Sequence, residues 1–302
     1  MSPLPADIVK SRPAADAPDI AAVAAELVAC GSLEMGADAP EDAQRIASLL
    51  PAGTPVYVNH LPRRELAHTL PALVALSEAG LEPVPHVAAR RIASRAEAQS
   101  FLKQAVRLAS VRKVLLIGGD VAEPLGPYGD AALFMRDHLL PESGVEQVGL
   151  ASYPEGHPRV ASGKIAAALA DKVALARAQG LGVHLVTQFS FAPNRIVEHC
   201  ADLARRAPDL PLYVGLPGPT SPRTLLRYAQ RCGVSASLRA LQAQGMGAVR
   251  LFTHADPTDQ LTALARHVLA GSANNVVGVH LYSFGGVATT AHWMNARITA
   301  RS

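Results

Sequence analysis

The feature that most constrains the fold of this chain is a repeated alternation of short apolar runs and longer helix-forming segments. Each apolar run has the β-branched and aliphatic composition of a fully buried strand. The runs expected to be strands are residues 32–36, 54–60, 82–88, 111–119, 147–153, 183–190, 210–216 and 276–282. Strands that alternate with helices in this way predict a parallel sheet covered by helices.

The segments between these runs are expected to be helical. The expected helices cover residues 64–79, 94 onward, 130–140, 164–178, 193–206, 221 onward, 236–244, 258–269 and 289–298. Together they make about eight strand–helix units, and one barrel of this kind takes about 250 residues. Because the chain has 302 residues, the prediction is an α/β protein with a single (β/α)8 TIM barrel. The alternative is an open doubly wound sheet, but no Gly-x-Gly-x-x-Gly turn follows the first expected strand.

The chain before the first strand predicts two further features. Residues 1–18 are rich in Pro, Ala and Asp and are expected to form a flexible N-terminal arm. Residues 19–28 are expected to be an extension helix, with Asp19 near its start where a negative charge suits the helix dipole. Residues 19–302 are then one catalytic barrel domain.

Composition and charge exclude several classes of function. The net charge of +3 is spread along the chain without a basic stripe, so a nucleic-acid partner is not expected. The pairs Arg90-Arg91 and Arg205-Arg206 are interpreted as solvated faces of helices and loops. No signal pattern and no uncharged apolar span of bilayer length is present, so a soluble protein without a membrane partner is expected.

The cysteines bear on the compartment and on metal binding. Three cysteines lie far apart in the sequence, at Cys30, Cys200 and Cys232. Their odd number and scatter favour a reducing cytoplasm over a disulfide framework or a zinc site. We therefore expect a cytoplasmic protein without a metal site. The oligomeric state stays open, a homo-oligomer included.

Polar residues lie at or just after the carboxyl end of nearly every expected strand. They are Glu34, Asn59, His60, His86, Asp120, Tyr153, Glu155, His157, Gln188 and Tyr282. The carboxyl ends of the strands of a (β/α)8 barrel meet at one rim, where the active sites of this fold lie. We therefore expect these side chains to share that rim.

Two acids in this set suit catalysis. Glu34 lies between Leu33 and Met35, so we expect desolvation to raise its pKa and keep it protonated as a general acid. The alternative for Glu34 is a salt bridge to an Arg or Lys of the barrel. Asp120 follows two glycines that let the backbone approach a ligand closely. Its alternative role is to cap the next helix.

Other strand-end residues have both structural and functional interpretations. His86 is either a core histidine or a ligand-binding group. His60, His86 and His157 lack the i, i+4 spacing of a helix-borne metal pair. The amide of Gln188 has donors and an acceptor that suit the edge of a pterin. Phe191, on the same strand end, is interpreted either as core or as a contact of a ring system.

In this order, the strand-end motifs resemble those of the methylenetetrahydrofolate reductase family. The matching pieces are Leu33-Glu34, Pro85-His86, Gly119-Asp120, Tyr128, Ala151-Ser-Tyr-Pro-Glu-Gly-His-Pro158, Thr187-Gln188-Phe189, Gly215-Leu-Pro217 and Leu281-Tyr282. The resemblance implies a (β/α)8 barrel that holds FAD. It also implies that NADH or NADPH reduces the flavin, which passes hydride to 5,10-methylenetetrahydrofolate and gives 5-methyltetrahydrofolate.

The resemblance also implies roles for particular residues. Glu34 and Asp120 would be catalytic, with Glu34 protonating the leaving nitrogen of the folate. The substrate would contact Glu34, Gln188, Phe191 and Tyr282. The cofactor would contact Asn59, His86, Gly119, Asp120, Tyr128, Gly129, Tyr153 and His157, with Lys172 and Arg177 as candidates for its phosphate side.

The chain also departs from the family pattern. Gly118 stands where the family usually has Arg, Asn59-His60 replaces a Thr segment, and Gly285-Gly286 replaces an Asn-Arg pair. A flavin-free reaction, with hydride passing directly from nicotinamide to folate, therefore stays open. Oxidation of 5-methyltetrahydrofolate at the same site in one-carbon catabolism stays open as well, and so does a catalytically silent barrel that binds folate or flavin.

Overall fold

The structure is a computed structural model that describes residues 19–61, 63–157, 160–232, 234, 256–271 and 274–300. The arm predicted at residues 1–18 and the helix predicted at residues 236–244 lie outside the described residues. Cys232 ends a described helix, but its side chain also lies outside them.

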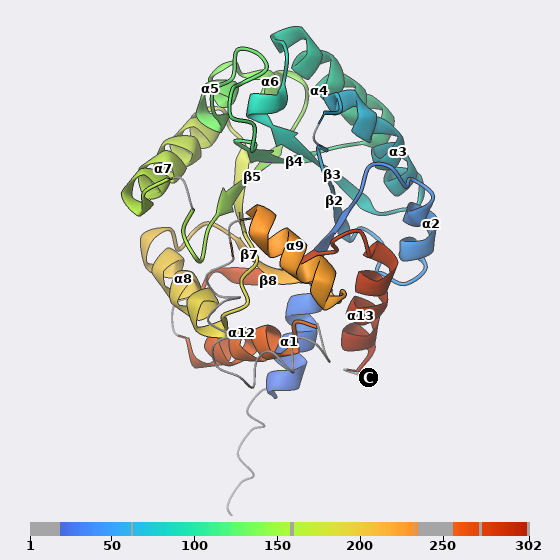
Figure 1. Ribbon diagram of the computed structural model, residues 1–302, viewed down its shortest axis with the longest axis vertical. Helices are drawn as coiled ribbons and strands as arrows, with labels where there is room; N and C mark the ends of the chain where they lie inside the picture. The colour runs from blue at the N-terminus through green and yellow to red at the C-terminus, as the bar shows by residue number, and fades with distance from the viewer. Residues whose placement is uncertain are drawn as a thin grey trace, which may run out of the picture.

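Eight parallel strands close into a barrel in which each strand pairs with the next in chain order and the last pairs with the first (Figure 1). The strands are β1 (Ser32–Met35), β2 (Pro55–Val58), β3 (Glu82–Ala88), β4 (Lys113–Ile117), β5 (Gln147–Ser152), β6 (Gly182–Thr187), β7 (Leu212–Pro217) and β8 (Val276–Tyr282). Each strand overlaps one of the predicted ranges. The predicted (β/α)8 barrel is therefore confirmed.

Helices surround the barrel and connect its strands (Figure 1). They are α1 (Ile20–Ala29), α2 (Asp42–Ala47), η1 (Leu66–Thr69), α3 (Leu70–Glu78), η2 (Ala89–Arg91), α4 (Arg95–Ala109), α5 (Ala131–Arg136), α6 (Leu139–Glu142), α7 (Ser162–Ala178), α8 (Pro193–Arg206), α9 (Pro222–Cys232), α12 (Thr258–Ala270) and α13 (Val287–Thr299). The predicted extension helix is α1, and it packs against α12 and α13.

Local sequence signals account for several helix starts. The side chain of Asp19 accepts a hydrogen bond from the backbone N–H of Ala21 at the start of α1. Ser94 caps α4 by accepting from the N–H of Glu97, as the Ser-x-x-Glu pattern predicts. Asp130 caps α5 through the N–H of Leu133. Each cap satisfies a backbone donor that the helix leaves unpaired.

Two helical predictions differ from the structure. The single helix predicted at residues 130–140 is split into α5 and α6, because His138 takes a left-handed backbone conformation with φ of 58°. The short helix α2 was not predicted, since its six residues give too short a stretch for a helical period to be recognised.

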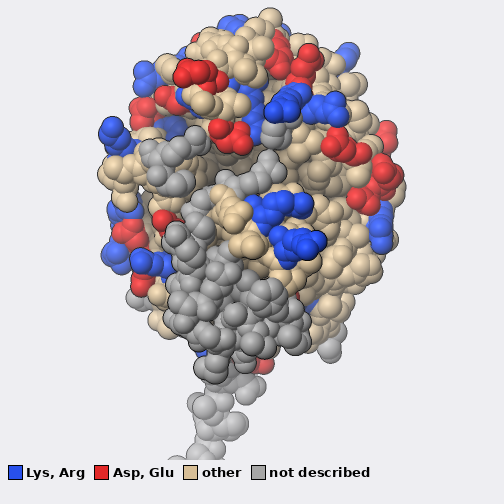
Figure 2. Space-filling model, viewed as in Figure 1, with Lys and Arg blue, Asp and Glu red and all other residues tan. Residues whose placement is uncertain are grey.

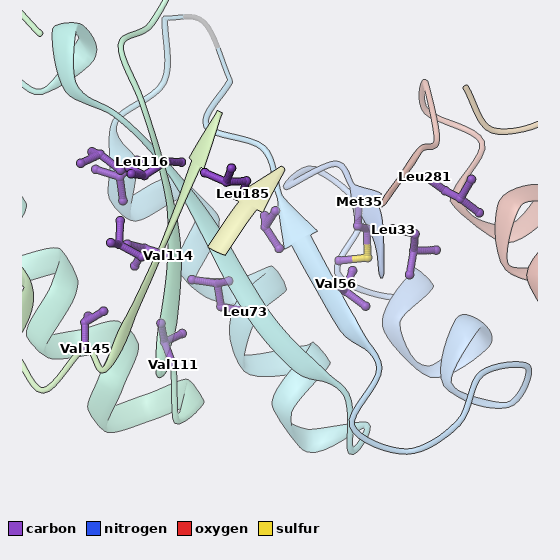
Figure 3. Close-up of a cluster of buried hydrophobic side chains, with 14 of the residues drawn as sticks. Leu33, Met35, Val56, Leu73, Val111, Val114, Leu116, Val145, Leu185 and Leu281 are labelled. Atoms are coloured by element: carbon purple, nitrogen blue, oxygen red, sulfur yellow. The ribbon is translucent and has the colours of Figure 1, made fainter. Parts of the chain in front are cut away.

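The main core lies between the outer face of the strands and the helices. Figure 3 shows Leu33 and Met35 of β1, Val114 and Leu116 of β4 and Leu73 of α3, all fully buried. Burying one such side chain is worth about 1.5–3 kcal/mol. Along each strand, these outward-facing residues alternate with residues that face the barrel interior. The candidate site is built from the inward-facing residues.

The surface and the helices bear on possible partners. Figure 2 shows basic and acidic side chains intermixed on the face seen in Figure 1. Arg205 and Arg206 are exposed, as predicted. Among the described helices, none combines the length and apolar composition needed to cross a membrane.

Candidate active site

Alternate residues of the strands point into the barrel, and many of them are polar here. The strand register pairs Glu34 with Tyr57, Ser32 with His280, and Gly149 with His184, so these residues share the inner face. The buried polar side chains on this face are Ser32, Glu34, Tyr57, His86, His184 and His280. Bulky branched residues usually fill the interior of this fold. A buried group with three imidazoles therefore needs a reason.

The carboxylate of Glu34 is the centre of this group. Asn59, directly after β2, donates from Nδ2 to Oε2 of Glu34 at 3.3 Å. Oε1 of Glu34 lies 3.7 Å from Nε2 of His86 and 3.5 Å from Nε2 of His280. Four strands, β1, β2, β3 and β8, thus bring these side chains together. Of the predicted site residues, Glu34, Asn59 and His86 form one cluster.

The surroundings of Glu34 set its ionisation. Burial raises the pKa of the Glu34 carboxyl, but the contacts with His280, His86 and Asn59 outweigh burial and lower the pKa below its usual value. The prediction that desolvation keeps Glu34 protonated is therefore wrong, because these neighbours stabilise the carboxylate. Burial also lowers the pKa of His86 to about 4, against the pull of the Glu34 charge. His86 is thus a neutral imidazole beside a carboxylate at neutral pH.

A second layer of polar contacts lies on the same inner face. The hydroxyl of Ser32 lies 2.8 Å from Nδ1 of His280, and the hydroxyl of Tyr57 lies 3.0 Å from Nε2 of His184. The Tyr57 ring packs edge-on against the His280 ring, with centroids 4.7 Å apart. A side chain at Gly149 would place its Cβ 2.6 Å from Nε2 of His184. The glycine therefore makes room for that imidazole.

Sequence reasoning did not single out four of these residues as part of the site. They are Ser32, Tyr57, His184 and His280. The signal that could have found them is the two-residue period of a strand. Ser32 lies two residues before Glu34, and the same spacing relates Tyr57 to Asn59 and His280 to Tyr282.

Two arginines after β3 hold the loop that follows β4. Arg91 contacts Oδ1 of Asp120 through Nη2 at 2.5 Å and Nε at 3.2 Å, and it also donates to the carbonyl of His60. Arg90 donates to three backbone carbonyls of this loop, that of Gly129 at 2.7 Å among them. The interpretation of this pair as solvated is therefore wrong. The side chain of Arg91 is only 10% exposed.

Asp120 lies on the rim of the barrel rather than inside it. Its side chain is 62% exposed and is paired with Arg91. It does not cap the next helix, since Asp130 caps α5. The preceding Gly119 has φ of 93°, a left-handed conformation that favours glycine.

Four more predicted cofactor contacts lie on the loops after β4 and β5. Tyr128 is buried, and its hydroxyl donates to Oδ2 of Asp137 at 2.6 Å. The backbone of Gly129 is held by Arg90. Tyr153 and His157 pack edge to face, with ring centroids 5.3 Å apart. Of these, the Tyr128 hydroxyl is already bonded inside the protein.

The two predicted phosphate-side cations lie away from the rim. Arg177 is in the last turn of α7 and pairs with Asp209, which precedes β7, so it lies near the amino ends of the strands. Arg177 nevertheless lines the same cavity as Tyr153, another predicted cofactor contact. Lys172 is half-buried, about 15 Å along α7 from its first residue at a rise of 1.5 Å per residue. Burial lowers the pKa of Lys172, although the nearby charges of Asp130 and Asp171 oppose this.

The other predicted substrate contacts, after β6 and at the end of β8, are divided between core and rim. Oε1 of Gln188 accepts from the N–H of Phe189 at 3.1 Å. Phe191 is 2% exposed and packs in an apolar cluster with Phe189, which contradicts its predicted contact with substrate. Tyr282 is partly buried, and its hydroxyl donates to the carbonyl of Thr187 at 3.0 Å.

Among the described residues, the side chains around Glu34 offer no free cation for the phosphates of FAD. A dinucleotide of this kind carries two phosphates, and protein cations usually neutralise them. Arg177 lies at the other end of the barrel, Lys172 is half-buried partway along α7, and the Arg91 guanidinium is occupied by Asp120 and a carbonyl. The Tyr128 hydroxyl is bonded to Asp137. These side chains therefore do not support a flavin whose phosphates lie beside Glu34.

A large cavity lies outside the barrel interior. It has a volume of about 1220 Å³ and lies between α7 and α8, with Ile165, Leu169 and Leu203 on its walls. None of the inward polar residues around Glu34 lines it. Two predicted cofactor contacts do line it, Tyr153 and Arg177, together with Arg195 and Arg206. The cavity is therefore separate from the Glu34 cluster but not from the predicted cofactor residues.

Taken together, the fold and the site define a (β/α)8 barrel with a buried carboxylate–imidazole cluster toward the carboxyl ends of its strands, the end at which enzymes of this fold place their active sites. No known family model matches the chain. Among solved structures it is similar to Xanthomonas albilineans dihydropteroate synthase with 4-aminobenzoic acid, with 14% identity and a TM-score of 0.48 over 90% of this chain and 92% of that one. It is also similar to 3-dehydroquinate dehydratase from Geobacillus kaustophilus HTA426, with 14% identity and a TM-score of 0.39 over 63% of this chain and 74% of that one. Neither similarity bears on activity.

Proposed function

We propose that this protein is an oxidoreductase that acts on one-carbon units bound to tetrahydrofolate. It transfers hydride from NADH or NADPH to 5,10-methylenetetrahydrofolate and gives 5-methyltetrahydrofolate. The observation that carries the proposal is the Glu34 carboxylate, held by Asn59, His86 and His280. The resemblance of the strand-end motifs to methylenetetrahydrofolate reductases supplies the substrate.

Unpaired polar atoms favour an enzyme over a silent binding barrel. Nε2 of His86 and Nε2 of His280 are buried and have no hydrogen-bond partner in the described part of the chain. Buried polar atoms are nearly always paired in folded proteins. Two unpaired nitrogens facing one carboxylate suit proton exchange, whereas a scaffold gains nothing from them.

The proposed reaction consumes one hydride and one proton. Opening the five-membered ring of the folate requires a proton on the leaving nitrogen and produces a cationic iminium. The carboxylate of Glu34 stabilises this cation electrostatically, whereas the charge of Asp120 on the rim is balanced by Arg91. Because Glu34 rests as a carboxylate, it must first accept a proton from a neighbouring group and then pass it to the leaving nitrogen.

The reductant is proposed to act without a flavin. Since the described side chains around Glu34 offer no cation for the phosphates of FAD, hydride passes directly from the nicotinamide ring to the methylene carbon. The reaction then balances: NAD(P)H is oxidised to NAD(P)⁺, the folate gains one hydride, and one proton is taken up. A co-substrate that binds only transiently needs a weaker phosphate site than a resident cofactor does.

Anaerobic turnover of 5,10-methylenetetrahydrofolate tests this proposal. NADH and NADPH are compared with and without FAD, and the absorbance of the purified protein is recorded. The expected result is folate-dependent oxidation of one nicotinamide by a protein that needs no flavin. A requirement for FAD would contradict the direct route, and oxidation that does not depend on folate would contradict the function. Incubation of 5-methyltetrahydrofolate with NAD(P)⁺ measures the opposite direction.

Two matched substitutions test the role of the carboxylate. Glu34→Gln keeps the size of the side chain and removes its charge and its proton transfer, so folate turnover should fall by about 10²–10⁴-fold. Glu82→Gln is the control, because Glu82 is also inward-facing but lies at the amino end of β3, 2.8 Å from Lys113. That variant should retain turnover. Equal losses in the two variants would mean that Glu34 has no special role.

A further inference from the structure

His280 has two polar neighbours on opposite sides of its ring. It is fully buried in β8, with Nδ1 2.8 Å from the Ser32 hydroxyl and Nε2 3.5 Å from Oε1 of Glu34. Nε2 has no hydrogen-bond partner within the described residues. The ring therefore bridges a hydroxyl and the proposed catalytic carboxylate.

We propose that His280 is a positioning residue that stores the proton which Glu34 passes to the substrate. This inference rests on the proposed function and adds the source of its proton. At rest the imidazole carries the proton and Glu34 is a carboxylate. When the ring of the folate opens, the proton moves from Nε2 of His280 to Oε1 of Glu34 and from Glu34 to the leaving nitrogen. Solvent returns a proton to His280 after product release, so no other reactant is needed.

The Ser32 hydroxyl suits this role because it can both donate and accept a hydrogen bond. When His280 is protonated on both nitrogens, Nδ1–H donates to the hydroxyl oxygen. When His280 has given up its Nε2 proton, Nδ1 keeps its hydrogen and the same bond persists. If the neutral ring instead holds its proton on Nε2, the hydroxyl turns and donates to Nδ1. The buried imidazole is therefore hydrogen-bonded in every state of the cycle.

The second imidazole beside Glu34 is less suited to storing a proton. Burial lowers the pKa of His86 to about 4, so it stays neutral at neutral pH. The other titratable groups that face His280 are Tyr57 on β2, with ring centroids 4.7 Å apart, Tyr282 on β8, with centroids 5.0 Å apart, and His184 on β6. Among these neighbours, Glu34 is the one whose carboxylate faces Nε2 of His280.

NMR of the protein labelled at its imidazole nitrogens tests the inference without substrate. The full chain is used, and His280→Gln assigns the His280 signals. We expect both nitrogens of His280 to be protonated at neutral pH, while His86 carries one proton. In Glu34→Gln the Nε2 signal of His280 should change, because this nitrogen lies 3.5 Å from Oε1 of Glu34. A neutral His280 at neutral pH in the wild-type protein would overturn the proposal.

A kinetic experiment with a matched pair of serine variants tests the passage of the proton. Ser32→Ala removes the hydroxyl bonded to His280, so the pH profile of kcat should move to lower pH with little change in KM. Ser152→Ala is the control, since the Ser152 hydroxyl is bonded to Nε2 of His199 at 3.1 Å, away from the Glu34 cluster. The pH profile of kcat for Ser152→Ala should match that of the wild-type protein. Identical profiles for both variants would overturn the role of the Ser32–His280 pair.

The two proposals fail in different ways. If the NMR experiment finds a protonated His280 and no folate is turned over, the proposed reaction is wrong and the proton store is supported. If folate is turned over and His280 is neutral, the proposed function stands and this inference is overturned.

Discussion

The guanidinium of Arg91 lies 2.5 Å from the carboxylate of Asp120 and joins the loop after β3 to the loop after β4. Arg91 also donates to the carbonyl of His60, after β2, so one side chain ties three successive strand ends together. The two partners differ in environment. The Arg91 side chain is mostly buried and the Asp120 side chain is mostly exposed. Their replacement should therefore have unequal effects.

Arg91→Ala is expected to lower the free energy of unfolding by about 1–3 kcal/mol, because it removes hydrogen bonds of a buried charged group. Asp120→Ala should cost only about 0–1 kcal/mol, since its carboxylate is largely hydrated. Arg112→Ala is a matched control, because Arg112 pairs with Glu146 on the surface. Urea denaturation measures all three variants. An Arg91→Ala variant as stable as Arg112→Ala would show that the buried guanidinium does not hold the rim.

Tyr57→Phe is expected to destabilise the protein by about 1–3 kcal/mol, because it leaves the buried Nε2 of His184 without its partner. Tyr213→Phe serves as the control. The Tyr213 ring also packs edge-on against His184, with centroids 5.6 Å apart. In urea denaturation, Tyr213→Phe should lower the free energy of unfolding by less than Tyr57→Phe does. A double-mutant cycle with His184→Leu tests the contact directly. In the His184→Leu variant, Tyr57→Phe should lower the free energy of unfolding by less than it does in the wild-type protein. If the two substitutions have additive effects, the hydrogen bond between Tyr57 and His184 does not contribute.

The fold could be predicted from the sequence because its signals are local. Eight buried runs alternate with helical segments, and Ser94 with Glu97 marks the start of α4. The break between α5 and α6 could not be predicted, because the left-handed conformation of His138 depends on its tertiary surroundings. The same holds for α2, which is too short to show a helical period.

The candidate site could be predicted only in part. The apolar strand runs of the sequence placed Glu34 and His86 at strand ends, and the structure brings the two side chains together. The ionisation of Glu34 could not be predicted, because it depends on His280 from the far end of the chain. Arg177 shows the opposite problem. Its spacing from the motif suited a phosphate contact, but it follows four turns of α7 and therefore lies near the other end of the barrel.

Gly149→Ala is expected to destabilise the protein by about 1–3 kcal/mol, because a Cβ at this position would lie 2.6 Å from Nε2 of His184. The overlap should push the imidazole away from the Tyr57 hydroxyl. Gly163→Ala is the control, since its Cβ would meet nothing within 4 Å. In a helix this change is expected to be neutral or to stabilise by up to about 1 kcal/mol. Thermal or urea unfolding measures the stability of both variants. If Gly149→Ala is as stable as the wild-type protein, the barrel interior beside His184 has room for a methyl group.

Acid is expected to destabilise the protein through its buried imidazoles. Burial lowers the pKa of His86 and of His184 to about 4, from an ordinary value of 6.5. Between these values the unfolded chain binds more protons than the folded one, so stability rises with pH in this window. It is lost as the pH falls from about 6.5 to about 4, by on the order of a few kcal/mol for each imidazole. The lowered pKa of Glu34 adds a loss of the same sign at more acidic pH, as its carboxylate is protonated.

Urea unfolding at a series of pH values measures this dependence. Substitution His184→Gln should reduce the slope of the unfolding free energy against pH by about one proton within the window. If the wild-type free energy of unfolding is flat between these pH values, the interior imidazoles are reached by water and the buried cluster around Glu34 does not exist as described.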